Sequence, residues 1–279
     1  MAEAPAQDAL QDTLSSVKHI IAVASGKGGV GKSTTSVNLA LALAKQGAKV
    51  GMVDADVYGP SLPMMLGVSD GTRPEVLEQK FFVPVEAQGI KSMSMGYLAT
   101  EQTPMVWRGP MASGALLQIL TQTMWGDLDY LVVDMPPGTG DIQLTLAQKA
   151  QLSGAVIVTT PQDIALLDAR KAIEMFRKVN IPILGIVENM AVHSCSQCGH
   201  QEHIFGEGGG QKVAAEYGTE VLGALPLSLD IREQSDSGKP PVMSDPTGTA
   251  ATAYGQIASK VAAILADKAS PGGPEIVIE

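Results

Sequence analysis

The chain has 279 residues, two cysteines and a formal net charge of −10. This length allows one large α/β domain or two small ones, and an acidic chain without a Lys/Arg cluster is a poor candidate for binding nucleic acid. The cysteines are too few for a disulfide scaffold, the N-terminus lacks the regions of a signal peptide, and no apolar run is long enough to span a membrane. We therefore expect a cytoplasmic protein that binds neither nucleic acid nor membrane.

Aliphatic strand patterns alternate with amphipathic helix patterns along most of the chain. Strands are predicted at residues 19–25, 49–54, 130–134, 155–160, 183–188 and 221–225. Helices are predicted at residues 32–46, 112–123, 142–150, 164–179, 211–217 and 250–266. This alternation predicts an α/β fold with a doubly wound, mostly parallel sheet that is covered by helices on both faces. Ligands of such sheets bind outside the carboxyl ends of the strands.

The domain organisation follows from where this alternation starts, breaks and stops. We predict a mobile leader at residues 1–17, a nucleotide-binding domain at 18–268 and a mobile tail at 269–279. Within the domain, residues 68–110 hold short alternating runs with several Pro and Gly, which indicates an insertion with short edge strands. Residues 190–207 form a loop that carries both cysteines.

A phosphate-loop motif, G-x-x-x-x-G-K-[ST], directly follows the first predicted strand at residues 26–33. Its glycines let backbone N–H groups converge on phosphate oxygens, while Lys32 reaches the β- and γ-phosphates and the Ser33 hydroxyl binds Mg²⁺. The predicted nucleotide-binding residues of this segment are Gly26, Gly28, Gly29, Val30, Gly31, Lys32, Ser33 and Thr34. Lys32 is also predicted to be catalytic, and the expected ligand is Mg-ATP.

A second lysine, Lys27, follows the first glycine of the motif. A lysine at this position is the deviant form of the Walker A motif, and the loop resembles that of the superfamily of MinD, ParA, the arsenite-pump ATPase and the nitrogenase iron protein. The resemblance implies a homodimer in which Lys27 reaches the phosphates of the partner subunit. There it would act like an arginine finger and neutralise charge that develops on the γ-phosphate.

Two carboxylates, Asp54 and Asp56, stand at the end of the second predicted strand. Acids at this edge beside a phosphate loop suit either contact to Mg²⁺ through water or the orientation of an attacking water. Asp54 is the candidate for metal support. The superfamily resemblance assigns the water to Asp56, which is therefore the third predicted catalytic residue.

The third predicted strand ends in an aliphatic run and Asp134, followed by Pro136, Pro137 and Gly138. This is a Walker B pattern, in which Asp134 would hold Mg²⁺ through water. The stiff Pro-Pro-Gly bend is expected to place the amide of Gly138 near the γ-phosphate, so that loss of this phosphate releases the loop.

Asn189 ends a later strand. Its side-chain amide can both donate and accept on the edge of an adenine ring. The resemblance assigns base recognition to Asn189, with residues 226–230 closing over the base.

Cys195 and Cys198 form a C-x-x-C pair that is followed by glycine. Such a knuckle brings two thiolates onto one metal or cluster and lets backbone N–H groups face the sulfurs. Zn²⁺ or a [4Fe–4S] cluster takes four protein ligands, and a twofold dimer supplies four by pairing the same loop from each subunit. Three interpretations stay open. The pair binds a bridging [4Fe–4S] cluster; it binds zinc, with four cysteines across the dimer or with the help of His193, His200 or His203; or it is a redox dithiol or an incidental knuckle.

Several motifs together resemble the ApbC/Mrp family over residues 18–268. Besides the phosphate loop, Asn189-Met190 and the cysteine pair, they are Asp54-Ala55-Asp56-Val57-Tyr58-Gly59-Pro60-Ser61, Trp107-Arg108-Gly109-Pro110-Met111, Asp134-Met135-Pro136-Pro137-Gly138-Thr139-Gly140-Asp141, Thr160-Pro161-Gln162-Asp163 and Phe205-Gly206-Glu207-Gly208-Gly209. The resemblance implies a slow ATPase that holds a labile [4Fe–4S] cluster between two subunits. Its implied partners are scaffold proteins and the apo iron–sulfur proteins that receive the cluster.

Three other functions use the same phosphate loop. A spatial organiser of the MinD/ParA class needs a basic amphipathic C-terminal helix for membranes or a basic face for DNA, and residues 271–279 and the acidic composition favour neither. A zinc-stapled ATPase would have no cluster role. A biosynthetic ligase or kinase needs a substrate pocket, and residues 68–110 hold no evident acid–base pair.

Overall fold

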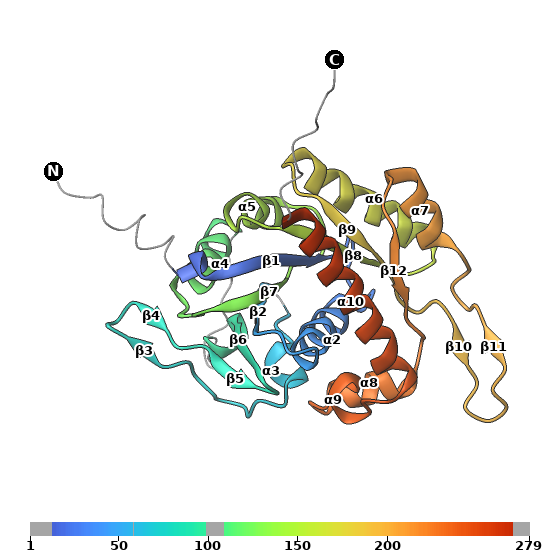
Figure 1. The fold of residues 1–279 in the computed structure, drawn as a ribbon, viewed down its shortest axis with the longest axis horizontal. Helices are drawn as coiled ribbons and strands as arrows, with labels where there is room; N and C mark the ends of the chain where they lie inside the picture. Colours follow the sequence, from blue (N-terminus) through green and yellow to red (C-terminus); the bar gives the residue numbers. More distant parts are fainter. Residues whose placement is uncertain (1–12, 58, 99–108, 270–279) are drawn as a thin grey trace, which may run out of the picture.

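A computed structural model describes residues 13–57, 59–98 and 109–269. Its strands are β1 (Val17–Ala24), β2 (Val50–Asp54), β3 (Val76–Leu77), β4 (Phe81–Phe82), β5 (Val85–Ala87), β6 (Ile90–Ser94), β7 (Leu128–Asp134), β8 (Gly154–Thr159), β9 (Ile183–Glu188), β10 (His193–Ser194), β11 (Gln201–Glu202) and β12 (Val221–Ala224). Eight of them form the central sheet, in the order β12-β9-β8-β1-β7-β2-β6-β5 (Figure 1). Every neighbouring pair in this sheet is parallel except β5–β6, so the predicted mostly parallel sheet is confirmed.

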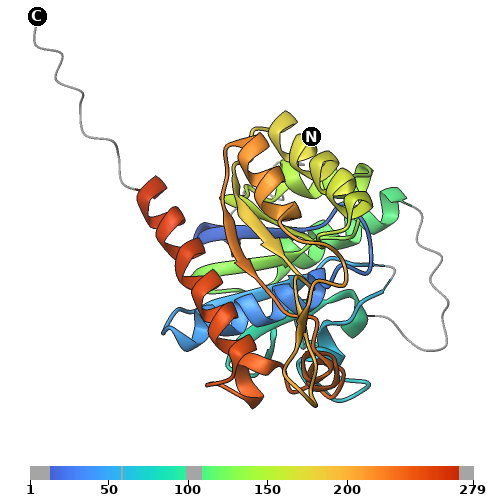
Figure 2. The same cartoon turned by 90° about the vertical axis from the view of Figure 1, so that its right-hand side faces the viewer.

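Helices cover both faces of the sheet, as predicted (Figures 1 and 2). The helices are α2 (Lys32–Lys45), α3 (Leu62–Met65), η1 (Met95–Tyr97), α4 (Gly109–Gln122), α5 (Asp141–Lys149), α6 (Asp163–Lys178), α7 (Gly209–Tyr217), α8 (Leu229–Asp236), α9 (Pro241–Ser244) and α10 (Thr249–Ala269). Side chains of α4, α5, α6 and α7 pack in one hydrophobic core, and side chains of α2 and α10 pack in the other.

Strand β1 shows how the sheet divides the two cores. Ile20 and Ala22 face the core under α4–α7, whereas Ile21 and Val23 face the core under α2 and α10. Successive side chains of a strand point to opposite faces, and a strand that is buried on both faces needs apolar residues at every position. The uninterrupted aliphatic run of β1 therefore reflects its place in the middle of the sheet.

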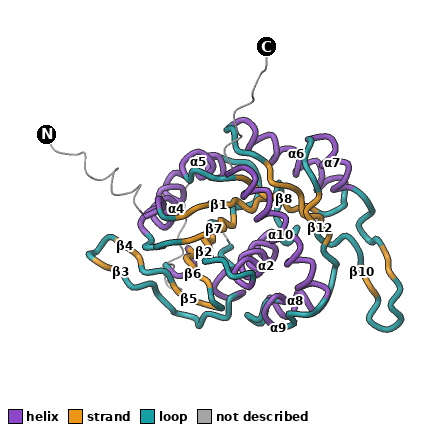
Figure 3. The backbone as a smooth tube through the Cα atoms, in the orientation of Figure 1, coloured by secondary structure: helices purple, strands orange, loops and turns teal. Residues whose placement is uncertain are grey.

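The 68–110 region carries short edge strands, as expected, but it also contributes to the interior of the sheet. Strands β3 and β4 form a separate antiparallel hairpin that projects from the body (Figures 1 and 3). Strand β5 is the antiparallel edge of the central sheet. Strand β6 pairs in parallel with β2 and buries Ile90 and Met93, so this strand is not an edge strand. Residues 99–108, with Trp107 and Arg108 of the family motif, and Tyr58 lie outside the described residues.

The folded body begins before the predicted domain boundary at residue 18. Val17 belongs to β1 and is buried, and the Thr13 hydroxyl donates a hydrogen bond to the carbonyl of Thr121 in α4. Residues 1–12 of the predicted leader and 270–279 of the predicted tail lie outside the described residues. In the part of the chain that the structure describes, no helix is long and apolar enough to cross a membrane.

The parallel register brings the predicted site residues to one edge of the sheet. Strands β2 and β7 pair so that Asp54 lies opposite Asp134. Strand β1 ends beside β7 at the start of the phosphate loop, and β9 ends at Glu188, next to Asn189. The carboxyl ends of these strands therefore form the floor of the candidate site, as the sheet topology predicts.

Candidate functional site

The phosphate loop joins β1 to α2 through two glycines in the left-handed region. Gly29 has a φ of 80° and Gly31, the N-cap of α2, has a φ of 82°, a conformation that residues with a Cβ rarely adopt. Gly28 and Gly29 are exposed, and a Cβ on Gly28 would meet nothing within 4 Å. The open loop at the N-terminus of a 14-residue helix is suited to binding an anion.

Lys32 is buried and is held by the Walker B aspartate. Its Nζ lies 2.6 Å from Asp134 Oδ1 and 3.1 Å from Ser33 Oγ, and the hydroxyl of Ser36 donates to the same Asp134 oxygen at 2.7 Å. The ammonium thus lies between the hydroxyl and the carboxylate that are predicted to bind Mg²⁺. Hard oxygen donors around a cationic position fit this metal, and Thr34 lies one residue further along the first turn of α2.

Asp54 is fully buried and organises the loop that follows β2. Its carboxylate accepts hydrogen bonds from the backbone N–H groups of Asp56, Ser61 and Leu62 and from the hydroxyl of Ser94. Burial, followed by the negative charge of Asp134, raises the pKa of Asp54 to about 7, although the backbone donors oppose this shift. Both oxygens of Asp54 are engaged with the protein, so its observed role is to shape this loop.

Asp56 lies within the loop that Asp54 organises. Its side chain is partly exposed, and its Oδ1 accepts a hydrogen bond from the N–H of Gly59 at 3.3 Å. A partly exposed carboxylate beside the phosphate loop is compatible with the orientation of a water molecule. That role stays a prediction.

The Pro-Pro-Gly bend after β7 lies against the start of the phosphate loop. The N–H of Gly138 donates to the carbonyl of Ser25 at 3.0 Å, and Gly138 has a φ of 95°. Gln143 of α5 holds the bend from the other side, because its Nε2 donates to the carbonyl of Pro137 at 2.6 Å and of Pro136 at 3.4 Å. The predicted contact of the Gly138 amide with a γ-phosphate therefore requires this amide to leave Ser25.

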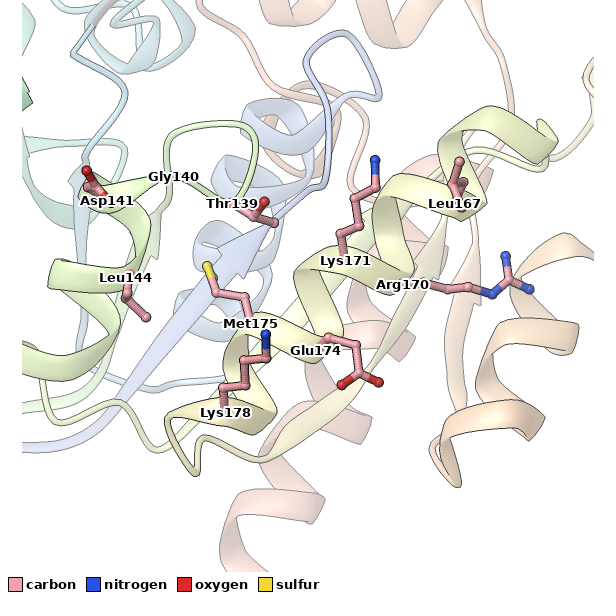
Figure 4. Close-up of a pocket in the computed structure, with 10 residues that line it drawn as sticks. All are labelled: Thr139, Gly140, Asp141, Leu144, Leu167, Arg170, Lys171, Glu174, Met175 and Lys178. Atoms are coloured by element: carbon pink, nitrogen blue, oxygen red, sulfur yellow. The ribbon is translucent and has the colours of Figure 1, made fainter.

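A groove of about 460 Å³ separates this bend from α6 (Figure 4). Thr139 and Gly140 line one wall and α6 lines the other. Two of the charged side chains on α6 are paired elsewhere: Lys171 contacts Asp168 at 2.9 Å, and Arg170 contacts Glu216 of α7 at 2.8 Å. The groove is thus bounded by the bend and the start of α5 on one side and by α6 on the other.

The first residues of the phosphate loop pack against α6. A Cβ on Gly26 would lie 2.0 Å from the carbonyl oxygen of Asp168, so only glycine fits there. Lys27 is partly exposed, and its carbonyl accepts a hydrogen bond from the hydroxyl of Ser25 at 2.8 Å. Its reach into a partner subunit stays a prediction.

Asn189 supports the phosphate loop directly. Its Nδ2 donates to the carbonyl of Val30 at 2.8 Å, and a Cβ on Gly31 would lie 2.1 Å from this nitrogen. The side chain is buried. The structure thus gives Asn189 a role that the sequence did not predict, while its recognition of the base stays a prediction.

The cysteine pair lies at the tip of a narrow hairpin that projects from the body (Figures 1 and 3). Strands β10 and β11 form its stem, and the N–H of Cys195 donates to the carbonyl of His200 at 2.9 Å. Backbone N–H groups of Cys198 and Gln197 donate to the sulfur of Cys195 and, with the Cys198 thiol, lower the pKa of the Cys195 thiol. The turn therefore favours a thiolate, the form that binds metals.

The neighbouring histidines do not complete a metal site within one chain. His193 Nδ1 lies 3.1 Å from the carbonyl of Leu227, and His203 Nδ1 lies 2.7 Å from that of Ala191. Among the residues that the structure describes, no group of three or more His, Cys, Asp or Glu side chains could hold a metal ion. The zinc interpretation in which one chain supplies the cysteines and a histidine is therefore not supported by this arrangement.

Sequence reasoning missed three side chains that shape the site. Ser36 holds Asp134, Gln143 holds the Pro-Pro-Gly bend, and the buried Glu188 accepts a hydrogen bond from the N–H of Gly210. Ser36 lies one helical turn after Lys32, and this spacing only weakly indicates that the two side chains share a partner. The other two have no signal in the sequence, because their partners are backbone groups that only the fold brings near.

A family model described as "ParA: NUBPL iron-transfer P-loop NTPase" matches residues 16–262. The chain belongs to this family. One relative is the iron–sulfur cluster carrier protein of Pseudomonas fragi, which is 67% identical over 245 residues, or 88% of this chain and 85% of that protein. Another is the iron–sulfur cluster carrier protein of Escherichia coli K12, which is 59% identical over 255 residues, or 91% of this chain and 69% of that protein.

A solved structure supports the nucleotide site of this NUBPL-family NTPase. A nucleotide-binding protein of Archaeoglobus fulgidus in complex with ADP is 41% identical, has a TM-score of 0.73, and matches 83% of this chain and 91% of that chain. The fold, the phosphate loop and the family agree. The prediction of a P-loop nucleotide-hydrolysing protein is therefore confirmed.

Proposed function

We propose that this NUBPL-family NTPase is an ATP-dependent iron–sulfur cluster carrier, which holds a [4Fe–4S] cluster between two copies of the chain and transfers it to apo-proteins. The observation that carries the proposal is the hairpin tip, where backbone N–H groups face the sulfur of Cys195 and Cys198 is exposed. The names of the two relatives support the nature of the cargo.

The ligand count supports a homodimer. One chain offers two thiols, and its described residues hold no larger group of metal ligands. Two copies that face each other across a twofold axis supply four thiolates to one cluster. Because the tip is exposed, an acceptor protein can approach the cluster and replace these thiolates one at a time.

The nucleotide site supplies the switch. Ser33 and Asp134 would hold Mg²⁺, which neutralises charge on the β- and γ-phosphates, and Lys32 would turn from Asp134 to the phosphates. Asp56 would orient the attacking water, and Lys27 of the partner subunit would contact the γ-phosphate. ATP would thus draw the two subunits together, and hydrolysis would relax their interface.

Anaerobic reconstitution with iron and sulfide tests the proposal. The wild-type protein should take up one [4Fe–4S] cluster per dimer, measured by iron and sulfide content, visible absorption and mass in solution. Cys198→Ser should lose the cluster and keep its affinity for Mg-ATP. Ser196→Ala, which changes an exposed residue between the two cysteines, should retain the cluster.

The same experiment separates the carrier from a zinc-stapled ATPase. A carrier passes its cluster to an apo iron–sulfur enzyme and restores the activity of that enzyme. A protein that binds only zinc across the dimer contains no sulfide after reconstitution and restores nothing. Full uptake of iron and sulfide by Cys198→Ser would show that the cluster is not bound at the hairpin.

A further inference from the structure

We infer that Glu188 and Asn189 form a mechanical link that couples nucleotide binding at the phosphate loop to the position of the cysteine hairpin. The two residues are adjacent at the end of β9, and both are buried. One contacts the phosphate loop and the other contacts the segment that follows the cysteines. The inference rests on the proposed function only for the cargo that the hairpin holds.

The first half of the link is the contact between Asn189 and the phosphate loop. Asn189 Nδ2 donates to the carbonyl of Val30 at 2.8 Å, over a sequence separation of 159 residues. The same nitrogen fills the space that a Cβ on Gly31 would occupy. A shift of Val30 or Gly31 when phosphates bind must therefore displace the Asn189 side chain or break this hydrogen bond.

The second half of the link is the contact between Glu188 and the start of α7. The Glu188 carboxylate accepts a hydrogen bond from the N–H of Gly210, in the first turn of this helix, where a negative charge is favoured. A Cβ on Gly210 would lie 2.9 Å from Glu188 Oε2 and 3.2 Å from Glu188 Cβ. The segment that carries the cysteines ends at α7, so Glu188 anchors its C-terminal end.

The N-terminal end of that segment is also tied to the link. Met190, the residue after Asn189, has a φ of 57°, which is unusual for a side chain of this size and persists only where the surroundings impose it. The N–H of Ala191 then donates to Leu225 O, and the carbonyl of Val192 accepts from the N–H of Leu227, each at 2.9 Å. The chain from Asn189 to the hairpin stem is therefore short, and backbone hydrogen bonds at Ala191 and Val192 fix its path.

Both ends of the hairpin segment thus depend on the end of β9. A displacement of Asn189 is passed on through the backbone to Met190 on one side, and through Glu188 to Gly210 on the other. Besides these two ends, His193 contacts Leu227 and His203 contacts Ala191 at the stem, whereas the side chains from Ser196 to His200 at the tip are exposed. Nucleotide binding should therefore change the position or the mobility of the cysteines as a unit.

Hydrogen exchange of the amides of residues 193–209, with and without Mg-ADP, tests the link without reference to any cargo. In the wild-type protein, Mg-ADP should change the exchange rates of these amides by about fivefold or more, the lower end of ordinary allosteric coupling. In Glu188→Ala, which removes the acceptor for Gly210 and keeps the route through Met190, this response should be clearly smaller than in the wild-type protein while Mg-ADP still binds. Glu188→Gln keeps an acceptor oxygen and should retain the response.

Cobalt binding to the two thiols gives a second readout. Titration of Co²⁺, followed by its thiolate absorption, should give an affinity that Mg-ADP shifts by about fivefold or more in the wild-type protein. Glu188→Ala should bind Co²⁺ with a clearly smaller shift. The matched control is Glu207→Ala, an exposed glutamate of the same segment, which should retain the wild-type shift.

Two results would overturn the link: a wild-type protein whose hairpin does not respond to Mg-ADP, or a Glu188→Ala protein that responds like the wild type. A Glu188→Gln protein that has lost the response would also overturn it, because this variant guards against a folding defect in Glu188→Ala. None of these results bears on whether the cysteines bind a cluster. Conversely, a cluster that survives Cys198→Ser refutes the assignment of the cluster to the hairpin and leaves the hydrogen-exchange result standing.

Discussion

Lys32 and Asp134 form a buried ion pair, with 2.6 Å between Nζ and Oδ1, at the position where the phosphates and the metal are expected. Lys18 and Asp129 form a pair with nearly the same distance, 2.7 Å, but the Lys18 side chain is 71% exposed. These two lysine–aspartate pairs therefore differ mainly in burial. Their comparison separates the cost of an unpaired buried charge from the loss of a salt bridge in water.

Lys32→Ala should destabilise the protein without nucleotide and abolish ATP hydrolysis. It leaves the buried Asp134 without its cation, which typically costs about 3–5 kcal/mol. Lys18→Ala should leave both the unfolding midpoint and hydrolysis unchanged, because water screens the exposed pair. Urea unfolding and phosphate release measure the two effects. If the two variants were equally stable, burial of the ion pair would not determine the cost of removing its lysine.

Asp54→Asn should change how stability depends on pH. Burial and the charge of Asp134 raise the pKa of Asp54 from 3.8 to about 7 in the folded state. A carboxyl with a raised folded pKa contributes stability that is fully present below its unfolded pKa and is lost as pH rises through the folded pKa. Relative to Asp54→Asn, the wild-type free energy of unfolding should therefore fall between about pH 4 and about pH 7. If urea unfolding gave the same pH dependence of the unfolding free energy for both proteins, the raised pKa of Asp54 would be refuted.

Gln143→Ala should loosen the Pro-Pro-Gly bend. It removes the hydrogen bonds to the carbonyls of Pro137 and Pro136, at a cost of about 1 kcal/mol in unfolding free energy. We expect faster hydrogen exchange at the Gly138 amide and a changed rate of ATP turnover. Gln148→Ala, at an exposed position of the same helix, is the control and should change neither. Unchanged exchange at Gly138 in Gln143→Ala would mean that Gln143 does not hold the bend.

Gly31→Ala should damage both the fold and the nucleotide site. Its φ of 82° disfavours a Cβ, and this Cβ would collide with Asn189 Nδ2. We expect a loss of about 1–3 kcal/mol in stability and weaker binding of Mg-ATP. Gly28→Ala is the control for stability, because a Cβ there meets nothing within 4 Å. Thermal unfolding compares the two variants, and an equal effect would argue against the collision.

The sequence was informative where one residue pattern determined the outcome. The six predicted strands and six predicted helices match elements of the structure because long aliphatic or amphipathic runs specify them. Asp54 and Asp134 could be placed at one edge because parallel strands end together. The short elements were missed: α3 has four residues and begins next to Pro63, and β10 and β11 have two residues each. Such lengths carry no periodicity.

The contacts within the site were harder to predict than its residues. The phosphate loop, the Walker B aspartate and the cysteine pair each have a recognisable spacing. Glu188 does not, because its partner is the backbone of Gly210, 22 residues away. Gly26 belongs to the motif, but its close approach to Asp168 comes from the packing of α6 against the loop. Contacts of this kind depend on how the chain is folded and not on a local pattern.

The β10–β11 hairpin is narrow, so an interface between its tip and another protein has a small area. A protein that approaches the tip needs to contact only a few residues, because the hairpin projects from the body of the molecule (Figure 1). Contacts of small area give short-lived complexes. In the proposed carrier, a contact confined to the tip would let the acceptor dissociate without a separate step to break a large interface.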